Sequence, residues 1–347
     1  MERLKGVCIG AGYFSQFHFE AWQRMADVEI LAICDSDAEK AKEVCAKYGF
    51  KNAYTDSAEM LQKEKPDFVD IITPPETHLS LCQLAIAHSV HIICQKPLAS
   101  SYEESVEIAK IAGDAPVRMM VHENFRFMPW HRELKKLLDQ KVIGDKSHAI
   151  NLHMRMGDGW QKDAYMNRQP YFREMERLLI YETGVHFIDV FRYLGGEISQ
   201  VYAKLRTLNN NIKGEDFAWV QVDFANGTLG FIDANRYNEN TSEDPRLTFG
   251  TVLIEGNKGS LRLYDTGKIT VQPLGEKETE HKYSFENKNF SGDCVYATQR
   301  HFIDSLISEQ PFETEVSSYL KNLEVQDAVY DSNEKGIPVP IHINQIP

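Results

Sequence analysis

The sequence predicts an α/β protein in which a doubly wound parallel sheet is followed by a larger, mostly antiparallel sheet. Strand-like and helical stretches alternate through residues 4–121, which is typical of βαβ units with parallel strands. From Val201 onward apolar residues recur with a period of two, which indicates strands that are buried on one face. We therefore expect two domains, over residues 1–122 and 123–347.

The composition narrows the classes of function. The chain has 347 residues, with 38 Lys and Arg against 51 Asp and Glu, so its formal net charge is −13. That sign argues against nonspecific binding to nucleic acid or to an anionic membrane surface. A hydrophobic content of 42% is ordinary for a globular protein with a sizeable core, and no apolar run approaches the length of a membrane span.

The cysteines predict a reducing compartment. None of the six forms a Cys-x-x-Cys pair, and three of them lie in apolar strand-like runs, so we expect thiols rather than disulfides or a zinc site. The start of the sequence shows no secretory signal pattern, and we expect a cytoplasmic protein. The cysteines are Cys8, Cys34, Cys45, Cys82, Cys94 and Cys294.

A glycine-rich turn follows the first predicted strand, Leu4–Ile9, and precedes a helix predicted over residues 13–25. In a dinucleotide-binding turn of this kind, the first glycine permits the tight turn and the second lets the backbone approach a pyrophosphate at the helix N-terminus. Gly10 and Gly12 fit these two roles, and the small Ser15 replaces the third glycine. The residues of the turn are Gly10, Ala11, Gly12, Tyr13, Phe14 and Ser15.

An acid stands at the end of the second predicted strand, Val28–Cys34. Asp35 follows Gly12 by 23 residues, close to the spacing of the acid that binds the ribose hydroxyls of NAD. The residues after it, Ser36 and Asp37, include no arginine for a 2′-phosphate, so the sequence favours NAD over NADP. Asp35 could also cap the helix that begins near residue 38.

The alternation then presents further polar residues at the carboxyl ends of strands, where open α/β sheets bind ligands. Thr73, Pro74 and Pro75 end one strand, and His78 follows at a loop-to-helix junction, where we expect a solvent-facing or capping histidine. Lys96 ends another strand and is held against Pro97; it could serve proton transfer at a cofactor or be a surface lysine. These strands are predicted over 51–54, 68–73, 91–95 and 117–121, and the helices over 37–48, 57–62, 79–88 and 102–112.

The second part begins with a predicted helix and strand and then loses its periodicity. The stretch 157–173 mixes aromatic, arginine and amide side chains and is either a substrate loop or a surface excursion fastened by its aromatic residues. Beyond it, Asn226-Gly227 and Asn257-Lys258-Gly259 are hairpin signals. The predicted helices are 130–138, 294–308 and 317–331, and the predicted strands are 147–155, 217–224, 228–234, 247–255 and 260–264.

A mostly apolar helix over 179–194 carries three ionisable residues. Glu182, His186 and Asp189 have i, i+4 and i+7 spacing and therefore share one helix face. Buried ionisable groups need partners or a task. An acid–base role is favoured over a metal site, because no further ligands accompany these residues, and we expect no metal.

Together these motifs resemble the glucose–fructose oxidoreductase/inositol dehydrogenase (Gfo/Idh/MocA) family. The resemblance rests on GAGYFS, Asp35, TPPETH at 73–78, CQKPLA at 94–99 and HENFRF at 122–127. It implies an N-terminal Rossmann domain and a C-terminal α/β domain whose large open sheet makes a homo-oligomer, a dimer or a tetramer. It also implies oxidation or reduction of a sugar, sugar acid or polyol carbon with NAD or NADP.

The resemblance implies a role for individual residues. Lys96 would contact both nicotinamide and substrate, and His186 would share or relay the hydroxyl proton with it. Glu182 stands where the family usually has an aspartate and would orient the imidazole or contact substrate. Asn124, Arg126 and Arg173 are candidates for binding substrate hydroxyls or a carboxylate. The cofactor residues would be Gly10, Gly12, Tyr13, Phe14, Asp35, Thr73, Pro74, Pro75, His78, Gln95, Lys96 and Asn124.

A second departure, at Gln95, and similarity to one subgroup refine this expectation. Gln95 replaces the glutamate of the family's Glu-Lys-Pro element and so removes a negative charge beside Lys96. The segments CQKP, MVHENFR and IKGED are similar to a subgroup containing D-apiose dehydrogenases, whereas residues 157–175 do not match it. Two alternatives to a dehydrogenase stay open: a glycosidase-type enzyme that uses bound NAD for internal redox, and a non-catalytic NAD-binding sensor or interaction protein.

Overall fold

The computed structural model describes residues 3–341 and divides the chain into two compact units. The first unit runs from the N-terminus to Asn124 and includes Cys294–Lys321; the second comprises Phe125–Asp293 and the chain from Asn322 onward. The expected boundary after residue 122 lies close to the first crossing. The return of Cys294–Lys321 to the first unit was not expected, because only long-range packing determines it.

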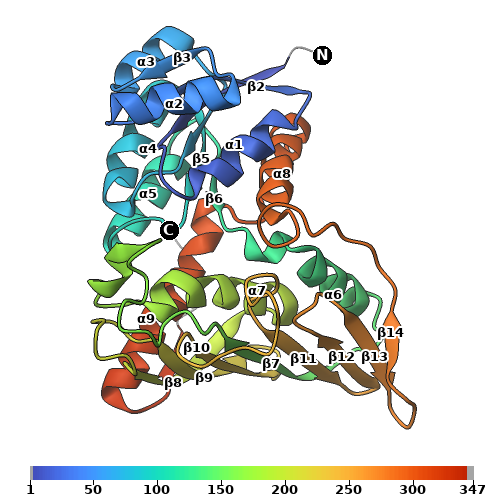
Figure 1. Ribbon diagram of the computed structural model, residues 1–347. Coiled ribbons are helices and arrows are strands. Elements are labelled where there is room, and N and C mark those ends of the chain that lie inside the picture. Colours follow the sequence, from blue (N-terminus) through green and yellow to red (C-terminus); the bar gives the residue numbers. More distant parts are fainter. Residues whose placement is uncertain (1–2, 342–347) are drawn as a thin grey trace. The chain divides into compact units, whose positions relative to one another are not determined.

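The first unit contains the predicted doubly wound parallel sheet (Figure 1). All its strand pairs are parallel, and the strand order β3-β2-β1-β4-β5-β6 reverses direction between β1 and β4. Such a reversal opens a crevice at the carboxyl ends of the strands. The strands are β1 (Leu4–Ile9), β2 (Val28–Cys34), β3 (Asn52–Tyr54), β4 (Phe68–Ile71), β5 (His91–Gln95) and β6 (Met119–His122).

Helices cover this sheet because both of its faces are apolar. One face packs with α1, α2 and α8 in a single cluster that includes Phe19, Trp22, Phe68 and Phe302. Side chains on alternate positions of the strands, such as Val69 and Ile92, are also buried, as expected of a parallel sheet. The helices are α1 (Ser15–Gln23), α2 (Ala38–Tyr48), α3 (Ser57–Glu64), α4 (His78–Ala87), α5 (Tyr102–Gly113) and α8 (Cys294–Ser308).

The second unit is built on a nine-stranded sheet with the order β14-β13-β12-β11-β7-β10-β9-β8-β15. Its pairs are antiparallel except for β7 with β10, so the predicted mostly antiparallel sheet is confirmed. The strands are β7 (Ser147–Arg155), β8 (Ile198–Arg206), β9 (Phe217–Phe224), β10 (Leu229–Asn235), β11 (Thr251–Gly256), β12 (Gly259–Leu263), β13 (Ile269–Pro273), β14 (Thr279–His281) and β15 (Val339–Pro340).

The two faces of this sheet differ. Helices α6 (Pro129–Asp139) and α7 (Val185–Gly195) lie along one face, and α9 (Val316–Lys335) lies against β8 (Figure 1). On the opposite face Trp219 is 50% exposed and Leu229 is 53% exposed. No helix within residues 3–341 is long and apolar enough to cross a membrane.

Candidate active-site residues

The glycine turn after β1 requires Gly10 and leaves space at Gly12. Gly10 has φ +106°, and a Cβ built there would lie 2.8 Å from the carbonyl oxygen of Ile72. A Cβ at Gly12 would meet no atom within 4 Å. The Ser15 hydroxyl donates to the Gly12 carbonyl at 2.7 Å, so the serine that replaces the third glycine closes the turn.

Asp35 braces the same turn. Its Oδ2 accepts a hydrogen bond from the backbone N–H of Ala11 at 2.7 Å, and its Oδ1 accepts one from the N–H of Asp37 at 2.9 Å. Each carboxylate oxygen keeps a second lone pair that can accept a ribose hydroxyl. The alternative role of Asp35 as a helix cap is wrong, because Asp37 caps α2 by accepting from Glu39 and Lys40.

These residues fit an NAD pyrophosphate and ribose. Helix α1 begins at Ser15 with no side-chain cap, so no carboxylate or hydroxyl competes with an anion for the positive end of its dipole. The open position at Gly12 lets a pyrophosphate reach that terminus, and Asp35 stands at the end of the adjacent β2. The backbone and side chains of the turn can therefore hold the cofactor without rearrangement of the glycine positions.

His78 differs from expectation. It is fully buried, with Nε2 lying 2.8 Å from the carbonyl oxygen of Thr73 and Nδ1 lying 3.0 Å from that of Leu98. Burial lowers the pKa of His78. The expectation of a solvent-facing or capping histidine is therefore wrong, and so is that of direct cofactor binding through the ring, since both nitrogens face the protein's own carbonyls. His78 instead ties the Thr73-Pro74-Pro75 segment to Leu98.

Lys96 and Asn124 follow the ends of neighbouring strands in the first unit. Lys96 comes directly after β5, is partly buried and is joined to Pro97 by a cis peptide bond. Asn124 follows β6, which pairs with β5, and its side chain is buried. Within residues 3–341 no group hydrogen-bonds the Oδ1 of Asn124, so this oxygen can accept a hydrogen bond from a ligand.

In the second unit, a π-helical turn over Leu179–Gly184 precedes α7. Its wider hydrogen-bond pattern changes the expected α-helical spacing between Glu182 and His186, and such turns are frequent at functional sites. The His186 ring stacks on Phe125 with centroids 4.0 Å apart and planes 6° apart. This stacking fixes the imidazole plane while the side chain stays 6% exposed.

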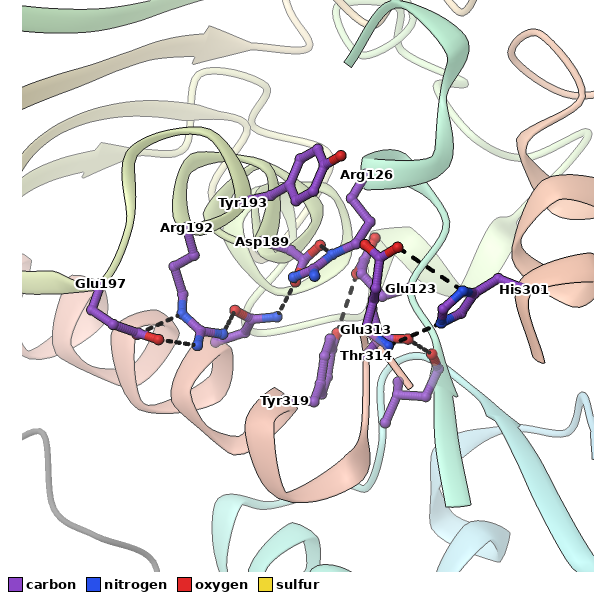
Figure 2. A network of polar contacts seen from close by, with 12 residues as sticks. Glu123, Arg126, Asp189, Arg192, Tyr193, Glu197, His301, Glu313, Thr314 and Tyr319 are labelled. Carbon is purple, nitrogen blue, oxygen red and sulfur yellow. Dashed lines mark hydrogen bonds and ion pairs between the residues drawn. The ribbon is translucent and has the colours of Figure 1, made fainter. Parts of the chain in front are cut away.

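Asp189 and Arg126 form a buried ion pair. The Arg126 Nε donates to Asp189 Oδ2 at 2.7 Å (Figure 2). Asn322 donates to Asp189 Oδ1 at 2.8 Å. Although burial opposes it, the charge of Arg126 lowers the pKa of Asp189. Arg126 therefore neutralises Asp189 through its Nε and Nη2, and the expected substrate contact stays a prediction for the rest of its guanidinium.

Glu182 is held by Thr183, which the sequence did not single out, and by Arg236, which the sequence leaves open between a substrate-facing and a surface position. The Thr183 hydroxyl donates to Glu182 Oε2 at 2.7 Å, and the buried Arg236 lies 3.7 Å from the same oxygen. Arg236 also binds Asp158 at 2.6 Å. Burial alone would lower the pKa of Arg236, but the negative charge of Asp158 raises it. The available signal was a lone arginine directly after a strand, which is equally typical of a surface residue.

The loop that precedes this helix is packed rather than extended. Phe172 is fully buried with Leu178 and Ile212, and Tyr165 packs against them. Nη1 of Arg173 donates to the carbonyls of residues 162 and 164, both at 3.1 Å. Arg173 therefore fastens its own loop, and only the rest of its guanidinium is available for the expected substrate contact.

Among the described residues, no group of three or more His, Cys, Asp or Glu side chains could hold a metal ion. All three ionisable residues of the second-unit helix contact protein groups: Glu182 contacts Thr183 and Arg236, His186 stacks on Phe125, and Asp189 pairs with Arg126.

Family models match both parts of the chain. Residues 4–123 match the oxidoreductase family GFO_IDH_MocA, described as an NAD-binding Rossmann fold, and residues 131–262 match the GFO/IDH/MocA C-terminal domain. A D-apiose dehydrogenase of Rhizobium rhizogenes is 31% identical over 98% of both chains. A D-apiose dehydrogenase of Paraburkholderia graminis is 30% identical over 98% of this chain and 90% of its own length.

A solved structure is also similar over the whole length. It is an oxidoreductase from Agrobacterium radiobacter, in complex with NAD⁺, L-tartaric acid and magnesium. It superposes with a TM-score of 0.90 at 29% identity and covers 98% of each chain.

Proposed function

Because the chain belongs to the Gfo/Idh/MocA family of NAD-binding oxidoreductases, we propose that it is an NAD-dependent dehydrogenase of a sugar, sugar acid or polyol. The observation that carries the substrate class is the full-length similarity to two D-apiose dehydrogenases. An aldose of that kind is therefore the first substrate to test. The preference for NAD over NADP is supported by Asp35, whose carboxylate would repel a 2′-phosphate.

Lys96 and His186 handle the proton of the reacting hydroxyl in this proposal. Oxidation converts a CH–OH carbon into a carbonyl, and bound NAD⁺ accepts the hydride. The hydroxyl proton must leave to a positioned base, and a lysine or an imidazole can accept it. The partial burial of Lys96 and the stacking of His186 on Phe125 support these assignments, because both limit the motion of the reacting groups.

Glu182 and Asn124 bind substrate in this proposal, with Arg173 as a further contact from the loop. Glu182 presents a carboxylate that Thr183 and Arg236 hold in one orientation, which suits it to accept sugar hydroxyls. Asn124 offers a buried carbonyl oxygen. Gly10, Gly12, Tyr13, Phe14, Asp35, Thr73, Pro74, Pro75 and Gln95 supply the cofactor-binding surface.

The test is NADH formation, followed by absorbance, across a panel of aldoses that includes apiose, polyols and sugar acids, with NADP in parallel. Activity with NAD that falls by about 10²-fold or more in Lys96→Ala and His186→Ala supports the proposal. Lys110→Ala and His88→Ala are matched controls, since both side chains are exposed. Silence across the panel with NAD bound, or an unaffected Lys96→Ala variant, contradicts it and favours internal redox or sensing.

We also propose a homo-oligomer formed through the outer face of the second-unit sheet and a cytoplasmic location. The exposed apolar side chains Trp219 and Leu229 support the former. The latter is supported by the six cysteines, all of which are free thiols.

A further inference from the structure

A chain of buried hydrogen bonds in the first unit ends at the backbone of Lys96. The Oε1 of Gln95 accepts the N–H of Lys96 at 2.8 Å, and the Nε2 of Gln95 lies 3.0 Å from Nε2 of His18. The Nδ1 of His18 lies 2.8 Å from Oδ2 of Asp70. His18 and Asp70 are fully buried and Gln95 is 8% exposed, so water does not replace these partners.

The donor and acceptor of every hydrogen bond in this series follow from the backbone N–H of Lys96, at which the series ends. The backbone N–H of Lys96 can only donate, so the Gln95 atom that faces it is the amide oxygen. The amide NH₂ of Gln95 therefore faces His18, and because NH₂ only donates, Nε2 of His18 must be the unprotonated acceptor. His18 then carries its proton on Nδ1 and donates it to Asp70.

The groups around His18 are compatible with a neutral ring. The His122 ring lies against it with centroids 4.1 Å apart, so a charge on both imidazoles would be unfavourable. Asp70 Oδ2 also accepts from Trp22 Nε1 at 2.7 Å and faces Gln299 Nε2 at 3.4 Å. The thiols of Cys8 and Cys94 also interact with Asp70. Burial raises the pKa of both thiols, followed by the charge of Asp70 for Cys8 and by Cys82 and then Asp70 for Cys94.

We infer that Asp70, His18 and Gln95 are positioning residues for Lys96, and that the polarity of the chain requires an amide at position 95. Asp70 fixes the tautomer of His18, His18 fixes the orientation of the Gln95 amide, and that amide holds the backbone N–H of Lys96. The inference rests on the proposed role of Lys96 and adds three residues from β4, α1 and β5 to it.

A carboxylate at position 95 would break this polarity. It could accept the Lys96 N–H, but it could not donate to the unprotonated Nε2 of His18. Asp70 and a buried glutamate would then share one histidine, and the pair of negative charges would bind a proton there. The departure of Gln95 from the family's usual glutamate is thus matched by the neutral His18 in this chain.

The first measurement is the tautomer of His18 in the unmodified protein. Nitrogen-15 histidine labelling with NMR distinguishes the Nδ1–H form, the Nε2–H form and the imidazolium, and loss of one ring signal in His18→Gln assigns it. We expect the Nδ1–H form in the unmodified protein and the imidazolium in Gln95→Glu under the same conditions. An Nε2–H form or an imidazolium in the unmodified protein overturns the inference.

The second measurement is steady-state kinetics of Gln95→Met, which keeps the side-chain length and removes both amide bonds. We expect kcat to fall by about 10²-fold, with a smaller change in KM, because the reacting lysine is displaced rather than removed. Gln299→Leu is the matched control: Gln299 faces Asp70 but is off the path to Lys96, and kcat should stay within about threefold. Unchanged kcat in Gln95→Met overturns the positioning role.

The two proposals fail in different ways. If Lys96→Ala retains full activity while His18 is in the Nδ1–H form, Lys96 has no catalytic role and the hydrogen bonds from Asp70 to Lys96 are only structural. If Lys96→Ala is inactive but Gln95→Met behaves like the unmodified protein, the catalytic role stands and the positioning inference is wrong.

Discussion

Nη1 of the buried Arg236 lies 3.7 Å from Oε2 of Glu182, so an arginine directly after β10 neutralises a carboxylate in the π-helical turn that precedes α7. Arg236 reaches Glu182 also through Thr183, whose hydroxyl lies 3.1 Å from its Nη1. The same guanidinium binds Asp158, at the start of the packed loop. Glu182 and the loop are therefore held by one cation, on which the proposed substrate contacts of both would depend.

Replacing Arg236 should affect folding and substrate binding together. Removal of Arg236 should cost about 3 kcal/mol, the lower end of the range for a buried pair, because its partners Asp158 and Glu182 are 21% and 22% exposed. We expect Arg236→Leu to lose about that much unfolding free energy in urea. Arg236→Lys should fold better and still show a raised KM, because a lysine cannot reproduce the two-oxygen contact with Asp158.

Arg246→Ala is the matched control for this prediction. Arg246 contacts the same Asp158 oxygen at 3.1 Å but is 36% exposed, so its loss should change the unfolding free energy by about 1 kcal/mol or less. Equal effects of the Arg246 and Arg236 substitutions would contradict the assigned role of Arg236.

The Arg126–Asp189 pair should make stability depend on acid pH. Arg126 lowers the pKa of Asp189 in the folded state, so the unfolded chain binds a proton more readily. The contribution is fully present above the unfolded pKa of about 3.9 and is lost as the pH falls through the lower folded value. Urea unfolding between pH 7 and 3 should show this loss in the unmodified protein and a weaker dependence in Asp189→Asn.

Asp189→Asn should also be about 3–5 kcal/mol less stable at pH 7, since it leaves Arg126 buried without its counter-ion. Asp327→Asn provides the comparison, because Asp327 pairs with Arg177 on the surface and should contribute about 1 kcal/mol or less. If both variants lose the same small amount, Asp189 does not act as the buried counter-ion of Arg126.

The glycine turn offers a variant that separates cofactor binding from folding. Gly12→Ala adds a Cβ that meets no protein atom, so thermal stability should stay unchanged. The methyl group would instead crowd the pyrophosphate, at a cost of about 1–3 kcal/mol, or about 10–100-fold in NADH affinity. NADH fluorescence titration and thermal unfolding of the same sample measure both quantities.

Gly10→Ala is the contrasting variant. Its φ of +106° and the 2.8 Å approach to Ile72 make any side chain strained, so stability and NADH binding should fall together. A Gly12→Ala variant that binds NADH normally would show that the pyrophosphate does not lie at this position.

The residues tested by these variants fall into two groups: those whose structure depends on neighbouring residues in the sequence, and those whose contacts join distant parts of the sequence. The glycine turn and Asp35 could be predicted because backbone conformation and strand spacing are encoded in neighbouring residues. The pairing of Arg126 with Asp189 joins residues 63 positions apart, and the burial of His78 depends on Leu98. Such contacts are decided by packing, so sequence reasoning did not predict the pairing of Arg126 with Asp189 and assigned His78 to a cofactor that its ring does not face.

The same limit explains Arg236 and the π-helical turn. A spacing of four residues between Glu182 and His186 predicts a common α-helical face, but the sequence does not show where the helix widens. Nor does it show which cation meets Glu182. The residue types of the site could be predicted, whereas their partners required the fold.

The outer face of the second-unit sheet should mediate self-association. Trp219 is 50% exposed there and its ring contacts Phe231 on the neighbouring strand, with centroids 5.7 Å apart. A tryptophan buried at the centre of an interface typically contributes about 2–4 kcal/mol. Trp219→Glu should therefore weaken self-association by about 30–1,000-fold, measured by sedimentation velocity over a range of concentrations.

Trp160→Glu is the matched control, because Trp160 is 48% exposed on the loop and lies outside this sheet. If the unmodified protein sediments as a monomer at all concentrations, the outer face is not a homo-oligomer interface.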